Sequence, residues 1–186
     1  MGKQAVTCAP SHHPPHRHQP PLPSLLQIRA LDSHKLVAAA GPQADVTQFV
    51  EYTQKNIVLY EFRNGARLST RAAANYVRSE LAYALRTNPY QVNLLLGGWD
   101  AVSGAELYFM DYLGSSTKTN FSAHGYAGYF LLSTMDRYWR PDMNLEDALA
   151  LARMCIKELQ TRFLMNQPRF KIKVADKDGT REVELN

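Results

Sequence analysis

Two short strands joined by a tight turn lie between two pairs of helices in this chain, and this order most constrains its fold. Residues 92–96 are almost entirely apolar, which is typical of a strand buried on both faces. A turn at residues 101–104 and a return strand at 106–112 follow. Because hairpins favour antiparallel sheets and helix pairs must cover sheet faces, this order predicts layers of helices and sheets.

Helical periodicity is clear before this hairpin. From Gln43 onward, apolar residues recur at spacings of three and four, and Gly65 marks the end of the helix. Ser69 or Thr70 can cap a second helix, which we expect to continue to Pro89. The short connection predicts that the two helices pack antiparallel.

After the hairpin, a third helix is predicted over residues 126–140 and a fourth from a cap at Asn144. Further strand pairs are predicted near both ends of the pattern, at 28–31 with 35–40 and at 170–174 with 181–185. Strand pairs and helix pairs therefore alternate. The simplest packing is an α+β fold, a four-layer αββα sandwich with helices outside two stacked sheets.

Residues 1–25 differ from the domain that we expect over residues 26–186. Six of the ten prolines lie in this first segment, with little apolar material to bury. We therefore predict a disordered Pro/His-rich extension. The alternatives are a metal site and a targeting segment. The segment's four histidines have no evident scaffold to fix a metal, and targeting signatures are incomplete. These histidines are His12, His13, His16 and His18.

Charge, hydropathy and cysteine content exclude several classes of protein. Residues 1–31 hold three basic and no acidic residues, so the remaining 18 basic and 17 acidic residues nearly balance. A nucleic-acid partner is therefore not expected. No apolar run reaches about 18 residues, so we expect no membrane partner. Cys8 and Cys155 are the only cysteines, which argues against a disulfide framework and for a reducing compartment.

Some residues invite a catalytic interpretation, but the pattern favours structural roles. His124 could act as a base, yet no nucleophile lies near it in the sequence. Asp100, Asp111 and Asp136 fall on a turn, a strand and a helix, which does not indicate a carboxylate pair. The dense aromatic residues of this region favour core and subunit contacts over a cofactor pocket. They are Tyr108, Phe109, Tyr112, Phe121, Tyr126, Tyr129, Phe130, Tyr138 and Trp139.

Charged residues on the fourth helix lie off its apolar stripe. We expect a solvated face, with ion pairs between subunits as the alternative. These residues are Arg153, Lys157, Glu158 and Arg162.

Several segments closely resemble proteasome beta subunits, above all the type at the fourth ring position. They are DVTQFVEYTQKNIVLYEFRNG (45–65), AAANYVRSELAYALR (72–86), YQVNLLLGGWD (90–100), AELYFMDYL (105–113), AHGYAGYFLLSTMDRYWRPDM (123–143) and KVADKDG (173–179). This resemblance implies the Ntn-hydrolase fold. In active members, a processed N-terminal threonine is the nucleophile and its own amine is the base. An Asp and a Lys on the first strands, and an Asp and a Ser-Gly pair after the last long helices, support it.

The chain departs from this catalytic pattern. The Pro/His-rich segment stands where the first strand pair is usual, so we expect that pair to be lacking. Thr7 is the only threonine before Thr47 and has no adjacent glycine to mark processing. Residues 166–170 carry no Asp-x-x-Ser-Gly motif. The fourth-position type is itself regarded as non-catalytic, so we expect no catalytic, cofactor-binding or metal-binding residues and no cofactor.

The resemblance also implies partners and location. They are the third- and fifth-position beta subunits, the opposing beta ring and the alpha ring, in the cytoplasm and nucleus. Two alternatives remain open. The first is an active threonine peptidase whose true N-terminus differs from the one given. The second is a stand-alone binding module that keeps the fold without the ring.

Overall fold

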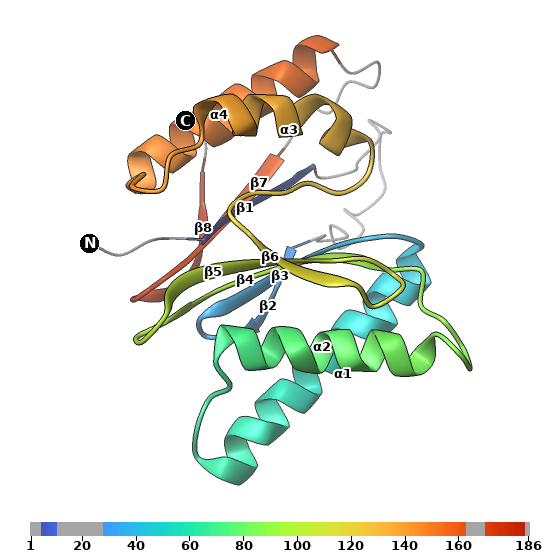
Figure 1. Ribbon diagram of the computed structural model, residues 1–186. Helices are drawn as coiled ribbons and strands as arrows, with labels where there is room; N and C mark the ends of the chain where they lie inside the picture. Colours follow the sequence, from blue (N-terminus) through green and yellow to red (C-terminus); the bar gives the residue numbers. More distant parts are fainter. Residues whose placement is uncertain (1–4, 11–27, 163–169, 185–186) are drawn as a thin grey trace, which may run out of the picture.

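Four layers make up the molecule, as the sequence predicts (Figure 1). The structure, a computed structural model, describes residues 5–10, 28–162 and 170–184. The lower layer contains α1 (Gln43–Asn64) and α2 (Thr70–Ala84), and the upper layer contains α3 (Tyr126–Tyr138) and α4 (Leu145–Arg162). Two antiparallel sheets lie between these layers, which confirms the αββα sandwich.

The lower sheet has five strands in the order β2-β3-β4-β5-β6. Their bounds are β2 (Ile28–Asp32), β3 (Lys35–Ala40), β4 (Asn93–Asp100), β5 (Gly104–Met110) and β6 (Ser116–Thr119). The first four match predicted strands, whereas β6 was not predicted. Its four residues are all polar, so apolar alternation could not reveal it. It forms at the sheet edge through pairing with β5, from Leu107↔Thr119 to Met110↔Ser116.

The upper sheet has three strands in the order β1-β7-β8. They are β1 (Ala5–Pro10), β7 (Phe170–Asp176) and β8 (Gly179–Val183). Strand β1 corrects the predicted disorder of residues 1–25 at Ala5–Pro10 only. Ala5 to Ala9 contain no proline, so this short stretch can pair with β7. The remainder of the predicted extension, including its four histidines, lies outside the described residues.

Local signals explain most helix boundaries. Gly65 adopts the left-handed conformation (φ 63°) that ends α1. The Ser69 hydroxyl accepts from Ala72 N at 3.1 Å, and Asn144 Oδ1 accepts from Asp147 N at 2.9 Å. Helix α2 ends at Ala84, earlier than predicted.

The main core lies between the lower sheet and α1–α2. Its most buried side chains include Phe49 and Ile57 of α1 and Leu94 and Leu96 of β4. A smaller cluster lies under α4, where Ile156 packs near β7 residues. No helix in the described residues is long and apolar enough to cross a membrane.

The β2–β3 turn joins the two sheets. Thr180 N donates to Ser33 O at 2.8 Å, which ties β8 to this turn. Beneath it, Lys35 Nζ pairs with Asp32 Oδ2 at 2.9 Å, and both side chains are almost completely buried. The positions of the two sheets are therefore fixed by polar contacts at one end as well as by apolar packing.

Candidate functional site: two aromatic helix surfaces

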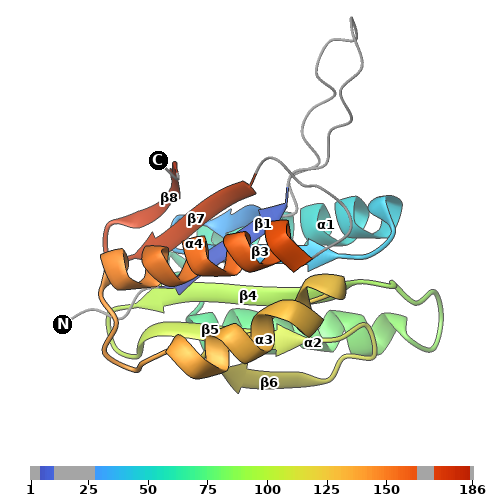
Figure 2. The ribbon, with the colours of Figure 1, turned by 90° about the horizontal axis from the view of Figure 1, so that it is seen from above.

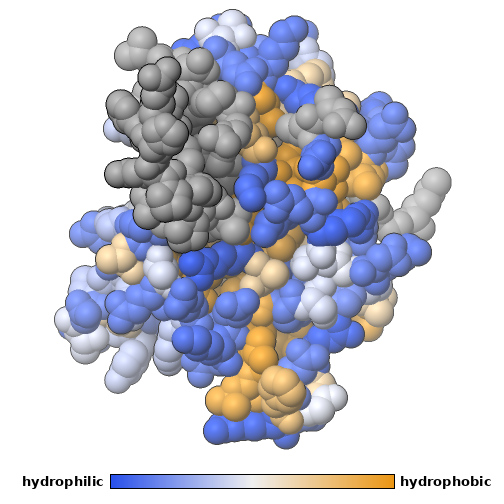
Figure 3. All heavy atoms as spheres, turned by 180° about the vertical axis from the view of Figure 1, so that it is seen from behind, coloured by the Kyte–Doolittle hydropathy of each residue, from blue (hydrophilic) through white to orange (hydrophobic). Residues whose placement is uncertain are grey.

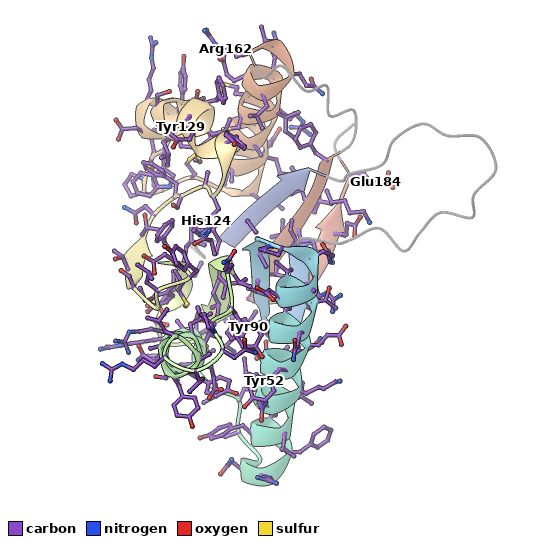
Figure 4. All side chains as sticks on the ribbon, turned by 90° about the vertical axis from the view of Figure 1, so that its right-hand side faces the viewer. Tyr52, Tyr90, His124, Tyr129, Arg162 and Glu184 are labelled. Atoms are coloured by element: carbon purple, nitrogen blue, oxygen red, sulfur yellow. The ribbon has the colours of Figure 1, made fainter. Side chains whose placement is uncertain are left out.

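His124 lies between α3 and the lower sheet, in the loop that precedes α3 (Figure 4). Its Nε2 is 2.9 Å from the Leu94 carbonyl oxygen, and its ring stacks on Phe109 with centroids 4.3 Å apart. Because a carbonyl oxygen only accepts, Nε2 carries the proton. Burial lowers the pKa of His124, although the Leu94 carbonyl and the Asp111 charge act in the opposite direction. His124 is therefore a neutral packing residue in the fold.

The three aspartates do not come together. Asp100 Oδ2 accepts from Thr70 N at 2.7 Å and so binds the start of α2. Asp111 Oδ1 accepts from Leu113 N and Ser115 N in a turn at the other end of the β4–β5 hairpin. Asp136 is exposed on α3. Asp100 and Asp111 thus serve backbone capping, and the three carboxylates form no pair.

One serine–histidine contact was missed by the sequence reasoning. Ser33 Oγ lies 2.8 Å from His34 Nδ1 in the β2–β3 turn. Arg67 Nη1 approaches the same nitrogen at 2.5 Å and Ser33 Oγ at 2.7 Å. A nitrogen that already accepts from a guanidinium is a poor base, so this contact links the turn to the α1–α2 connection instead. Adjacent serine and histidine residues in a turn gave no signal of it.

Other hydroxyl and thiol groups are not activated. The hydroxyls of Thr53 and Thr70 are buried without a hydrogen-bond partner. Burial raises the pKa of the Cys155 thiol to about 11, so it is protonated at neutral pH.

Exposed aromatic residues gather on both outer helix layers. The upper aromatic surface consists of Tyr126, Tyr129 and Tyr138 on α3, with Tyr129 84% exposed. Tyr112 is also exposed, Tyr108 is buried, and the other predicted aromatics are half-buried. The expected subunit contacts of these residues stay a prediction. Aromatic side chains exposed at this density are typical of subunit contacts.

A lower aromatic surface was missed by the sequence reasoning. It consists of Tyr52, Tyr60 and Phe62 on α1 and Tyr83 on α2, and Phe62 is 82% exposed. Hydrophobic surface gathers at the C-terminal end of α1 in Figure 3. Tyr60 continues the apolar spacing that predicts this helix, so its exposure corrects the prediction, whereas Tyr52, Phe62 and Tyr83 lie outside the predicted stripes. Only the observed packing shows that they have no cover within the described chain.

The charged residues of α4 lie at the surface. Arg153, Lys157 and Arg162 are exposed, and Arg162 pairs with Glu158 along the helix. This agrees with the solvated face expected from the sequence. Among the described residues, no cluster of three or more His, Cys, Asp or Glu side chains can hold a metal ion.

Comparisons with known proteins all point to one family. A family model described as "Proteasome subunit" matches residues 24–175. Proteasome subunit beta type-2-B of Arabidopsis thaliana is 54% identical over 156 residues, covering 84% of this chain and 78% of that protein. Proteasome subunit beta type-2 of Oryza sativa is 50% identical, covering 84% and 74%. Proteasome subunit beta type-4 of Saccharomyces cerevisiae is 43% identical, covering 85% and 81%.

Proposed function

The chain belongs to the proteasome subunit family, and we propose that its own contribution is structural rather than catalytic. Its role is that of a beta subunit of the 20S core, the assembly that degrades proteins. In this proposal it completes a ring and walls the proteolytic chamber, without cutting peptide bonds itself. It needs no cofactor or metal for this work.

The observation that carries the proposal is that four candidate nucleophiles among the described residues, Ser33, Thr53, Thr70 and Cys155, have no free base beside them. A nucleophile within the folded chain needs a base about 3 Å away that is free to take its proton, whereas an N-terminal threonine would use its own amine. Ser33 Oγ lies beside His34 Nδ1, which the Arg67 guanidinium also contacts. The hydroxyls of Thr53 and Thr70 are buried without a hydrogen-bond partner. The Cys155 thiol is buried and protonated. None of these four groups therefore has a free base that could take its proton, which peptide cleavage requires.

The two aromatic surfaces support contacts on opposite sides of the sandwich. One lies on the outer helices α1–α2 and the other on α3 (Figure 1). Such an arrangement suits a subunit that lies between two stacked rings. We propose the alpha ring and the opposing beta ring as these partners, and the third- and fifth-position beta subunits as neighbours within the ring. The assembled complex would act in the cytoplasm and the nucleus.

An active-site-directed epoxyketone tests the catalytic part of this proposal. The probe is applied to cell extract that contains the tagged chain, and the chain is then isolated and its mass measured. We expect no mass increase on this chain, while the catalytic beta subunits of the same extract are labelled. Labelling of this chain at an exposed N-terminal threonine would contradict the proposal and establish a threonine peptidase.

A further inference from the structure

Among the described strands, the upper sheet has two fewer than the lower sheet that it faces. Strand β1 pairs with β7 from Ala5↔Ala175 to Pro10↔Phe170, and no described strand lies on its other side. The outer edge of β1 therefore presents backbone N–H and C=O groups without a partner strand in the described part of the chain. Such an edge is a template for pairing with another extended segment.

Apolar residues of the lower sheet lie beside this edge without full cover. Side chains alternate along a strand, and Leu94 and Leu96 of β4 belong to the core with α1 and α2. Leu95 therefore faces the upper sheet, as do Leu107 and Phe109 of β5. All three are only half-buried, whereas Leu94 and Leu96 are completely buried.

Helix α3 lies above these residues and does not replace the missing cover. It packs mainly against α4 rather than against a strand. Figure 2 shows α3 over β5, with β1 and β7 to one side of it. Of the α3 residues whose burial is described, only Gly128 is buried, while Leu131 and Met135 are half-buried and Leu132 is exposed. The helix is apolar enough to cover a strand, yet no described strand of the upper sheet lies between it and the lower sheet.

We propose that this slot accepts an extended segment of another polypeptide as an added strand. The slot is bounded by the outer edge of β1, the upper faces of β4 and β5, and α3. A helix, about 10 Å wide, could not satisfy the backbone groups of β1, whereas a strand satisfies them directly. The segment would need about six residues to follow β1, with apolar side chains on both faces. This inference goes beyond the proposed function, because the isolated full chain should bind such a segment without any ring.

A synthetic peptide tests the proposal on the unaltered full chain. The probe is an eight-residue peptide of alternating Val and Ile with a lysine and a fluorophore added at one end. Two control peptides carry N-methyl groups on either the odd or the even residues, which remove one set of backbone donors each. We expect saturable binding, and about 10-fold or weaker binding for one of the two controls, because several hydrogen bonds to β1 are lost. Hydrogen exchange of the β1 amides should slow when the parent peptide binds.

A pair of variants locates the site. Leu107→Asp places a charge in the slot and should weaken binding of the parent peptide by about 10-fold or more. Leu113→Asp, in the exposed turn after β5, should leave binding unchanged. Because Leu107→Asp can also destabilise the sheet, its folding is checked by circular dichroism, and the N-methyl comparison stands without it.

Three results would overturn the proposal. Equal binding of both N-methylated peptides would mean adsorption to apolar surface rather than strand addition. Protection of α1 amides instead of β1 amides would place the peptide on the lower aromatic surface. If the β1 amides exchange more slowly at high protein concentration without peptide, a second copy of the chain would be the occupant of the slot. Ring incorporation is measured separately, so failure here does not count against the proposed function.

Discussion

The two helix layers differ in how completely the sheets cover them. In the lower layer, α1 and α2 bury Val46, Phe49, Val50, Ile57 and Val77 against a five-stranded sheet. In the upper layer, α4 packs on a three-stranded sheet and α3 has no large apolar residue fully buried among its described residues. The described sheet beneath α3 and α4 has three strands, two fewer than the sheet that α1 and α2 cover.

This comparison separates stability from interaction. The lower half has a continuous core and should provide most of the free energy of folding. The upper half keeps apolar surface that its own described strands do not cover. In a ring subunit, such surface is available for contacts with other chains, which are gained only on assembly.

Truncating one isoleucine in each layer tests the comparison with matched chemistry. Ile57→Ala in α1 should cost about 4 kcal/mol of unfolding free energy, because it leaves a cavity in a closed core. Ile156→Ala in α4 should cost about 2 kcal/mol, since the looser surroundings can collapse around it. Urea unfolding of the two variants measures both values. Equal losses would show that the two layers are packed equally well.

The buried ion pair at the sheet junction should have the next largest effect. Lys35→Met leaves the Asp32 carboxylate buried without its partner and should cost about 3 kcal/mol. Replacing both, with Lys35→Met and Asp32→Asn, should cost clearly less, because no lone charge remains. A double-mutant cycle by urea unfolding gives the coupling. Additive losses would mean that the two side chains do not stabilise each other.

His124, in the loop before α3, should have a smaller effect on the unfolding free energy, and this effect should appear as the pH falls. Its folded pKa is lowered by burial, so the unfolded chain binds the extra proton more readily. The contribution of His124 is therefore complete above about pH 6.5, the unfolded value, and decreases as the pH falls through the lower folded pKa. We expect His124→Gln to remove this part of the pH dependence. A difference between the two proteins that is constant from pH 8 to pH 5 would show that the ring is not held neutral.

The smallest effect is expected at the upper aromatic surface. Tyr129→Ala should change the unfolding free energy of the isolated chain by no more than about 0.5 kcal/mol, because the side chain is 84% exposed. The same variant should reduce the fraction of chain recovered in large assemblies. Thermal unfolding and native mass spectrometry measure the two quantities. A loss of stability without a loss of assembly would reverse the roles assigned to the two halves.

Elements with strong local signals could be predicted from the sequence. The α1 period ending at Gly65 and the Asn144 cap define helices that the structure confirms. Strand β6 could not be predicted, because its polar residues form a strand only through pairing with β5. Strand β1 was not predicted for a similar reason, because it forms by pairing with β7, which lies about 160 residues later in the chain.

Functional surfaces were harder to predict than elements. The role of His124 as a packing residue agrees with the sequence-based expectation. Arg67 contacts Ser33 and His34, although it lies more than 30 positions later in the chain, so no local pattern reveals this contact. Phe62 and Tyr83 could not be recognised as surface residues from their apolar character alone. Tertiary packing decides which apolar residues stay exposed.

Incorporation into the 20S core tests the central claim most directly. The tagged full chain is expressed together with the other subunits, purified under native conditions and treated with the epoxyketone, and intact assemblies are analysed by native mass spectrometry. The account predicts that the chain is present in the multi-ring particle and carries no probe. A stable monomer found only outside such particles, or a labelled chain within them, would contradict the account.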